Sequence, residues 1–498
     1  MAHVPTRWLV WTLSVPGAVA ALLVSAVAAA AHGMGERYDL PLPLNFYLMG
    51  AAATVALSFL ALALLARAPS DTGASMRLVE GWRLPSLPGA TPLVLVARGA
   101  SIGLFSALVL AGLIGSPNPF KNPLPVSVWV LGWVGIAYVC ALLGNVWALI
   151  NPWDNIFRLA EWSVRRARNG RDLAPILAYP PALGGWPAVV LFFAFAWMEL
   201  VWPARDNPAM LAAVILAYSA VTWTGMVLFG RHTWLESGEF LAVAFGLFAR
   251  FAVIGQRKCP HKAGLVLRPP AAGLLVDKPV APSLAAFALL MLATVTFDGL
   301  LETPLWAALS NAALDAPMMR GGAAVFGLDP YVLFATAALV VFPLIFASFY
   351  LLTVGLMSAA FAGSSATTFE FARLFVLTLV PIAIGYHLSH YLPFLLVAGQ
   401  FIIPVASDPF ALGWNLFGTR LSLIDFSVID ARLVWYASLM LIVGGHVIAV
   451  WLAHSQAGRR FAGDLVLRTQ LPMVALMIGY TAVSLWILAQ PIVSERSF

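Results

Sequence analysis

Charged residues are scarce in this chain. Asp, Glu, Lys and Arg make up 10% of its 498 residues, whereas soluble domains carry roughly 25%. Apolar residues make up 61%, and apolar runs of about 20 residues, enough to cross a bilayer core as a helix, recur almost from end to end. The composition therefore excludes a water-soluble catalytic domain. It predicts an all-α polytopic membrane bundle of about 11–12 transmembrane helices that forms a single domain over 1–498.

Cysteine is also scarce. The chain has two, Cys140 in an apolar run and Cys259 in a basic loop, so neither a disulfide framework nor a cysteine-based metal cage is available. The formal net charge of +6 does not indicate nucleic acid as a partner, because the basic residues lie in loops between apolar runs. The Gly-x-Ser-x-Gly elbow in a suitable setting and the His-Glu-x-x-His motif of common hydrolases are absent as well. The lipid bilayer is the partner that the composition predicts.

The apolar runs define the expected spans. They predict helices near 8–31, 44–66, 93–115, 126–150, 186–203, 209–230, 284–308, 329–355, 373–405, 431–455 and 470–490. Basic residues gather in the loops 67–92, 151–185, 256–283 and 456–468, which the positive-inside rule assigns to the cytoplasmic face. A further apolar run at 238–255 would put the second and third of these loops on opposite faces if it crossed. We therefore predict that it lies in the interface or re-enters the membrane.

The first apolar run has two interpretations. In residues 1–31, the apolar run begins after Arg7 and ends in a run of alanines, as in a signal sequence with a small-residue cleavage site. The run is also long enough to span, so we take it as the first helix and keep the signal-like segment as the alternative. Cleavage near Ala31 would leave His32 at the N-terminus, where its amine and ring could bind copper.

Ionisable side chains inside or beside the apolar runs are few. Each costs about 2.5–3.5 kcal/mol on insertion scales, so each implies a partner or a function. They include Glu199, His232, Glu236, Glu239, Asp298, Glu302, His387, His390 and His446.

His387 and His390 form the most informative pair. Their spacing of three places both rings on one helix face, about 5–6 Å apart, close enough to hold one metal ion. The stretch 373–405 is too long for one straight span and carries Pro381 and Pro393 on either side of the pair. We predict a helix break at membrane depth, of the kind that lines buried sites.

Asp298 is the expected partner of this histidine pair. We predict that it approaches His387 or His390 across a helix contact, either as a metal ligand or as the acceptor that orients the ring. Asp298 and Glu199 are the candidate catalytic carboxylates. The candidate ligands for a transition metal ion (Zn, Fe, Mn or Cu) are His387, His390, Asp298, His446, His232 and Glu236. The alternative is structural: a buried histidine can simply bond to a backbone carbonyl, and Glu236 can be a solvated loop residue.

Six strings spread over the chain carry a resemblance. They are Ala31–Leu42 (AHGMGERYDLPL), Gly144–Trp153 (GNVWALINPW), Thr296–Trp306 (TFDGLLETPLW), Gly385–Tyr391 (GYHLSHY), Ser407–Thr419 (SDPFALGWNLFGT) and Gly445–His454 (GHVIAVWLAH). Together they resemble a family of bacterial polytopic membrane proteins that carries the name fenitrothion hydrolase, over most of the chain. The resemblance implies hydrolysis of an organophosphate ester and a location in the bacterial inner (cytoplasmic) membrane. It assigns no catalytic residue.

Three kinds of function follow from these residues. A metal held by imidazole and carboxylate activates its bound water as a nucleophile, so the first hypothesis is a metal-dependent membrane hydrolase acting on a small apolar substrate. A transporter or permease would use the same side chains to bind a cation or relay protons past a broken helix. The third possibility is a subunit of a membrane complex, either structural or binding haem through His446 with His387 or His390.

Overall fold

The structure is a computed structural model that describes residues 38–65, 82–83, 90–257, 264–360, 367–461 and 465–494. Helices make up most of these residues and the strands are short, which confirms the predicted all-α polytopic bundle. The predicted first helix at 8–31, with its signal-like alternative, lies outside the described residues.

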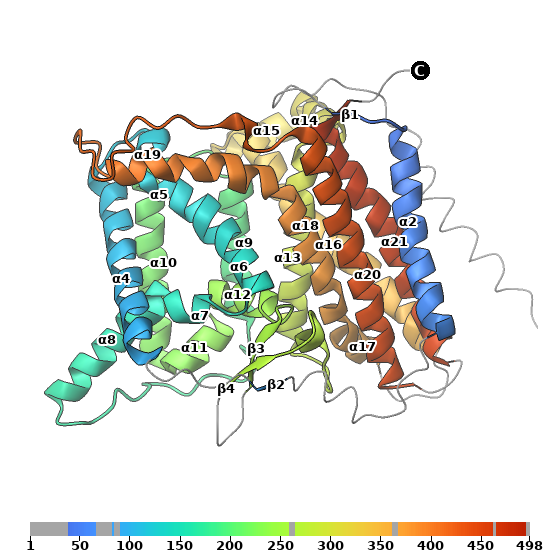
Figure 1. The fold of residues 1–498 in the computed structure, drawn as a ribbon, viewed down its shortest axis with the longest axis horizontal. Helices are drawn as coiled ribbons and strands as arrows, with labels where there is room; N and C mark the ends of the chain where they lie inside the picture. The colour runs from blue at the N-terminus through green and yellow to red at the C-terminus, as the bar shows by residue number, and fades with distance from the viewer. Residues whose placement is uncertain are drawn as a thin grey trace, which may run out of the picture.

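Long helices stand side by side and form the body of the bundle (Figure 1). They are α2 (Leu44–Leu65), α4 (Ala90–Ile114), α5 (Pro123–Pro125) continued by η3 (Val126–Gly135) and α6 (Ile136–Leu142), α9 (Trp186–Leu200), α10 (Pro208–Phe229), α13 (Pro282–Leu301), α16 (Pro330–Ala359), α17 (Thr368–Phe375) continued by η5 (Val376–Leu379) and α18 (Val380–His390), α20 (Ala431–Gly458) and α21 (Leu465–Ile492).

Shorter elements cover the two ends of the bundle (Figure 1). One end carries α7 (Trp147–Ile150), α8 (Pro152–Ala167), α11 (Arg231–Ser237), α12 (Phe240–Phe248), η4 (Ala272–Leu274) and an antiparallel sheet of β2 (Trp82–Arg83), β4 (Gly264–Leu267) and β3 (Ile254–Arg257). The other end carries η2 (Pro119–Lys121), α14 (Pro304–Asp315), α15 (Pro317–Phe326), η6 (Phe394–Ala398), η7 (Gly399–Phe401), α19 (Ile402–Ser407), η8 (Phe426–Val428) and the parallel pair β1 (Tyr38–Asp39) and β5 (Val493–Ser494).

The ten apolar runs predicted between residues 44 and 490, apart from 238–255, each contain helix. Nine helical stretches of the described residues are long and apolar enough to cross a membrane. The tenth, α9, has only 15 residues. It begins beside the start of α13, where Gly185 N donates to Ser283 Oγ at 2.8 Å, and it ends at the opposite end of the bundle (Figure 1). The predicted helix at 186–203 is therefore present and runs along the bundle, although it is shorter than the other nine.

The described parts of the four basic loops lie at one end of the bundle, here called the basic end (Figure 1). The three-stranded sheet joins two of these loops there, because β4 pairs with β2 on one side and with β3 on the other. A common end for all four loops agrees with the sequence analysis. That the basic end faces the cytoplasm stays a prediction of the positive-inside rule.

The apolar run 238–255 does not cross. It contains α12, a helix of nine residues, and then continues into β3, which returns to the sheet at the basic end. Glu239 caps this helix: its carboxylate accepts the backbone N–H groups of Leu241 and Ala242 at 3.0 and 2.8 Å. The prediction that this segment fails to span is confirmed.

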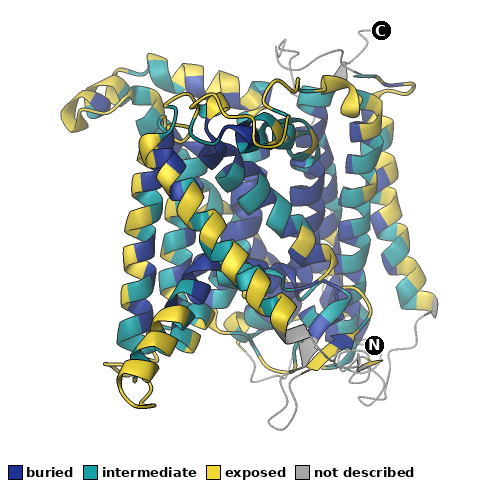
Figure 2. Cartoon of the chain, turned by 60° about the vertical axis from the view of Figure 1, so that its left-hand side comes forward, coloured by how far each residue is buried: buried dark blue, intermediate teal, exposed yellow. Residues whose placement is uncertain are grey.

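The helix that carries the histidine pair is the central one. The stretch Thr368–His390 is 94% buried, whereas α16 is 11% buried and Pro92–Ile114 of α4 is 6% buried. Figure 2 shows this contrast, with exposed residues along the outer helices and buried residues in the middle. His387 and His390 therefore face protein and not lipid.

The predicted helix break is present. Between α17 and α18 the helix tightens into the 3₁₀ turn η5, and α18 stops at His390. After Tyr391 the chain turns and runs across the end of the bundle opposite the basic end, through η6 and η7 to α19 (Figure 1). Pro393 stands at the start of η6, where its missing N–H prevents continuation of α18. The run 373–405 is thus one crossing followed by a segment at the surface.

Two glycines let α18 and α20 approach each other closely. A Cβ at Gly385 would lie 2.5 Å from the carbonyl oxygen of Leu441, and one at Gly445 would lie 2.7 Å from that of Pro381. Small residues permit such contacts between membrane helices and increase their van der Waals packing. The central helix is positioned by this contact.

Replacement of Gly445 tests this contact. We expect Gly445→Leu to destabilise the protein by about 1–3 kcal/mol, because the side chain has to displace the backbone of α18. Gly444→Leu is the matched control, since a Cβ at Gly444 meets no atom within 4 Å. Thermal unfolding of the two variants in detergent measures the difference, and equal losses in both would contradict the proposed close contact.

Candidate functional site

Asp298 and His390 meet in the interior of the bundle. His390 Nε2 lies 3.0 Å from Asp298 Oδ2, and the two side chains are 9% and 19% exposed. Asp298 comes from the last turns of α13, and His390 is the last residue of α18. The predicted approach of Asp298 to the histidine pair is confirmed, with His390 as the partner.

Tyr391 links this pair to a second carboxylate. Its hydroxyl donates to Asp298 Oδ2 at 2.6 Å and lies 3.4 Å from Glu199 Oε1. Tyr391 occupies the position directly after α18, where the helix ends. The result is a row of polar groups, here called the central row: Glu199, Tyr391, Asp298 and His390. Sequence reasoning named three of its members and missed Tyr391, whose role depends on the turn that ends the helix.

A small cavity lies beside the central row. It has room for about one water molecule. Its polar lining is Glu199, Thr294, His387 and Tyr391, and its walls are mainly apolar and aromatic. The indole of Trp133 also lines it and approaches Glu199.

His387 faces this cavity from within a group of aromatic rings. Its ring centroid lies 5.6 Å from Trp133, 5.6 Å from Phe248 and 4.7 Å from Tyr391. Its Nε2 is buried and has no hydrogen-bond partner among the described residues. His387 therefore shares the site with His390, although Asp298 contacts only the latter.

His446 lies apart from the histidine pair. Its Nδ1 is 2.8 Å from the carbonyl oxygen of Ile442, and its ring lies tilted beside that of Tyr480 of α21, with 5.7 Å between centroids. This is the structural alternative considered for buried histidines, a bond to a backbone carbonyl. The structure does not place His446 opposite His387 or His390, as shared haem ligation would require.

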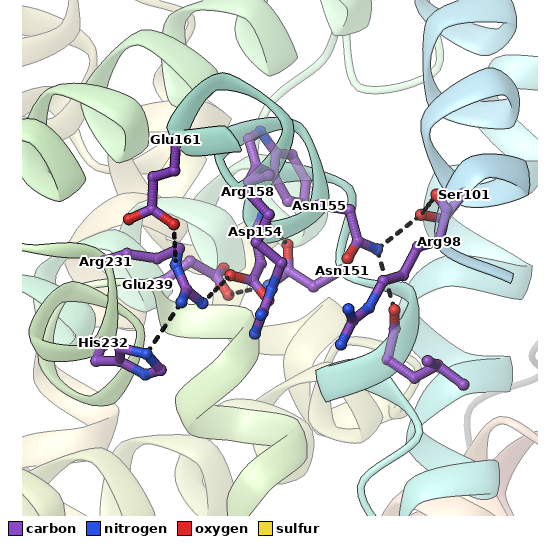
Figure 3. A network of polar contacts seen from close by, with 12 residues as sticks. Arg98, Ser101, Asn151, Asp154, Asn155, Arg158, Glu161, Arg231, His232 and Glu239 are labelled. Atoms are coloured by element: carbon purple, nitrogen blue, oxygen red, sulfur yellow. Dashed lines mark hydrogen bonds and ion pairs between the residues drawn. The ribbon is translucent and has the colours of Figure 1, made fainter. Parts of the chain in front are cut away.

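His232 and Glu236 belong to α11 at the basic end and also lie apart from the central row. Figure 3 shows His232 beside Arg231, whose Nη2 is 3.0 Å from His232 Nε2. Arg231 also binds Asp154 and Glu161, at 2.8 and 3.0 Å. Arg231 thus holds α11 against α8. His232 and Glu236 lie at this end of the bundle and do not extend the histidine site.

Glu239 is the most buried acidic residue of this second network, with an exposed fraction of 0%. Besides the two backbone groups of α12, it accepts hydrogen bonds from Tyr218 and from Asn151 Nδ2, the latter at 2.9 Å. Trp147 Nε1 lies 3.4 Å away. Five donors on one carboxylate satisfy its charge without a cation, so Glu239 acts as a structural cap.

The predicted set of six metal ligands is not assembled. Among the described residues, no three His, Cys, Asp or Glu side chains form a group that could hold a metal ion. The structure does not group His387, His390 and Asp298 with the other three residues. His232 and Glu236 lie on α11 at the basic end, and His446 bonds within α20. Metal binding stays a prediction, and only His387, His390, Asp298 and Glu199 lie at the central row and its cavity.

Comparison with known proteins gave no match: no family model, no curated protein and no solved structure is similar to this chain.

Loss of the Tyr391 hydroxyl tests the central row. We expect Tyr391→Phe to destabilise the protein by about 1–3 kcal/mol, since Asp298 loses one of its two hydrogen-bond donors in a buried setting. The control is Tyr331→Phe, at a residue that is 37% exposed. Unfolding in detergent is the measurement, and a Tyr391 variant as stable as the control would show that its hydroxyl does not support Asp298.

Proposed function

We propose that this chain is a transporter or permease in which the Asp298–His390 pair binds and releases a proton while a solute crosses the membrane. The observation that carries the proposal is a hydrogen-bonded carboxylate and imidazole inside the bundle, at the residue where the central helix stops. Ionisable groups in such positions serve proton relays and ion pathways in membrane proteins.

The chemistry of the pair suits proton exchange. A single charge in a low-dielectric interior is costly. A carboxylate and an imidazolium compensate each other's charge, and both groups are neutral after the proton moves between them, so neither state leaves an unpaired charge. Tyr391 extends the hydrogen bonds to Glu199. A second carboxylate is thereby within reach of the same proton.

The surroundings of the pair suit a transport cycle. The cavity has room for about one water molecule, so this conformation is closed to a solute. Opening requires a movement of helices, and the end of α18 already interrupts the backbone hydrogen bonds there. Interrupted helices are the elements that gate such sites in transporters.

Charge movement after a pH jump tests the proposal without knowledge of the solute. In vesicles adsorbed to a solid-supported membrane, the wild-type protein is expected to give a transient current as protons enter the site. Asp298→Asn should reduce the displaced charge at least about tenfold, because the pair then lacks its titrating carboxylate. Asp315→Asn should leave it unchanged, since the Asp315 side chain at the end of α14 is 87% exposed. Equal currents from wild type and Asp298→Asn would refute the role of the pair.

A metal-dependent hydrolase is the second candidate. It is favoured by His387 Nε2, which has no partner among the described residues and lines the same cavity as Glu199. A bound transition metal would supply an activated water there, and the resemblance to the fenitrothion hydrolase family points to ester hydrolysis. An ester substrate would need the cavity to open.

Elemental analysis of the purified protein separates this candidate from transport. The hydrolase hypothesis predicts about one metal ion per chain and at least tenfold lower occupancy in His387→Gln, as expected for loss of a ligand or its support. His446→Gln is the control, because His446 is equally buried but lies outside the site. Protein that contains no metal and does not hydrolyse fenitrothion would eliminate this candidate.

A further inference from the structure

A second polar cluster lies on the other side of Asp298, between α13, α18, α20 and α21. Its members are Thr296, Tyr386, His446, Tyr480 and Ser484. Thr296 and Tyr480 share a hydrogen bond between their hydroxyls, and the ring of His446 lies 5.7 Å from that of Tyr480. Four of the five side chains are at most 2% exposed, Tyr480 being the exception.

The cluster reaches the central row through Tyr386. A Cβ on Gly299, the residue after Asp298, would lie 2.1 Å from the Tyr386 hydroxyl oxygen. Only the absence of that Cβ lets the hydroxyl rest against the backbone beside Asp298. The Tyr386 ring also lies 5.9 Å from that of His390, between centroids. Tyr386 is therefore next to both members of the ion pair and yet bonded to neither.

Three polar atoms of the cluster have no hydrogen-bond partner among the described residues: Tyr386 Oη, His446 Nε2 and Ser484 Oγ. Buried polar groups are almost always bonded to protein or to ordered water, because desolvation without a bond is costly. One such atom can be a local exception. Three in one cluster, in contact with hydroxyls that are already bonded, indicate a shared partner.

Tyr350 is a buried tyrosine of the same bundle whose hydroxyl does have a protein partner. It is as buried as Tyr386, at 1% against 0% exposed, and its hydroxyl donates to the carbonyl oxygen of Ala372 at 2.7 Å. A buried tyrosine hydroxyl in this bundle can thus be hydrogen-bonded by the protein itself. The Tyr386 hydroxyl has no such partner among the described residues.

We infer that bound water occupies this cluster and connects His446 and Tyr480, through Tyr386, to Asp298. Water fits because it donates and accepts, as an imidazole nitrogen and two hydroxyls together require, and internal waters bridge two to four such groups. The water site stands on geometry alone. Its role, to deliver protons to the Asp298–His390 pair from the α20–α21 side, rests on the proposed function.

X-ray radiolysis with mass spectrometry tests the water site in the full-length protein. Radicals formed from bound water oxidise the side chains beside it, even when these are shielded from bulk solvent. We expect Tyr386 to be labelled about fivefold faster than Tyr350 or more, since only Tyr386 would contact internal water. Equal protection of the two tyrosines would overturn the inference, and this result does not depend on any transport activity.

The delivery role has its own measurement. Thr296→Val and Ser484→Ala remove hydroxyls of the cluster and leave the ion pair intact. We expect the pH-jump current to keep its total charge and to decay at least about threefold more slowly, because the path and not the binding site is changed. Wild-type kinetics in both variants would overturn the delivery role. If wild-type protein gives no current while Tyr386 is labelled, the proposed function fails and the water site stands.

Discussion

The hydrogen bond between Asp298 and His390 involves a helix, α18, that two glycines allow to pack closely against α20. Charged or strongly polar side chains at membrane depth need partners of their own, and these partners have to be held at fixed distance. Gly385 and Gly445 bring α18 against α20, and the result is a central helix that is almost wholly buried. The same helix ends at His390, so the buried pair lies where this enclosed helix ends and the chain turns. Packing and polarity are therefore coupled at this site: a change that separates α18 from α20 also moves the imidazole.

Proline determines where that turn falls. Pro393 prevents the helix from continuing, and the following segment crosses the end of the bundle instead of the membrane. The residue between helix and turn is Tyr391, whose hydroxyl can reach two carboxylates because it is no longer directed by helical geometry. The end of α18 thus also places the Tyr391 hydroxyl as a hydrogen-bond donor in the central row. This explains why the polar groups of three helices, α9, α13 and α18, converge at one place.

Much of the fold could be predicted from the sequence because membrane spans are a matter of length and composition. The spans from 44 to 490, the common end of the basic loops, the failure of 238–255 to cross and the break after His390 all follow from apolar length, loop charge and proline. The contact of Asp298 with the histidine pair could be predicted from the expected depth of these residues in the membrane, because a buried charge needs a partner at the same depth. The structure does not bring His446, His232 and Glu236 together with that pair. The helices α13, α18 and α20 are apolar on nearly every side, so their hydrophobic pattern does not indicate which face turns inward. Spacing within one helix, α11 included, does not show which other helix lies beside it.

The two polar networks differ in how their charges are satisfied, and the difference separates structure from function. At the basic end, Asp154 binds two arginines and Glu239 accepts five donors. Figure 3 shows how these groups are bonded to one another. In the interior, Asp298 has two donors, His387 has a ring nitrogen without a protein partner, and a cavity lies beside them. A network that is fully satisfied stabilises a fold and resists change. One that keeps unfilled hydrogen-bonding capacity next to an ion pair can exchange a proton, or accept a ligand, without first breaking the contacts that hold its helices together.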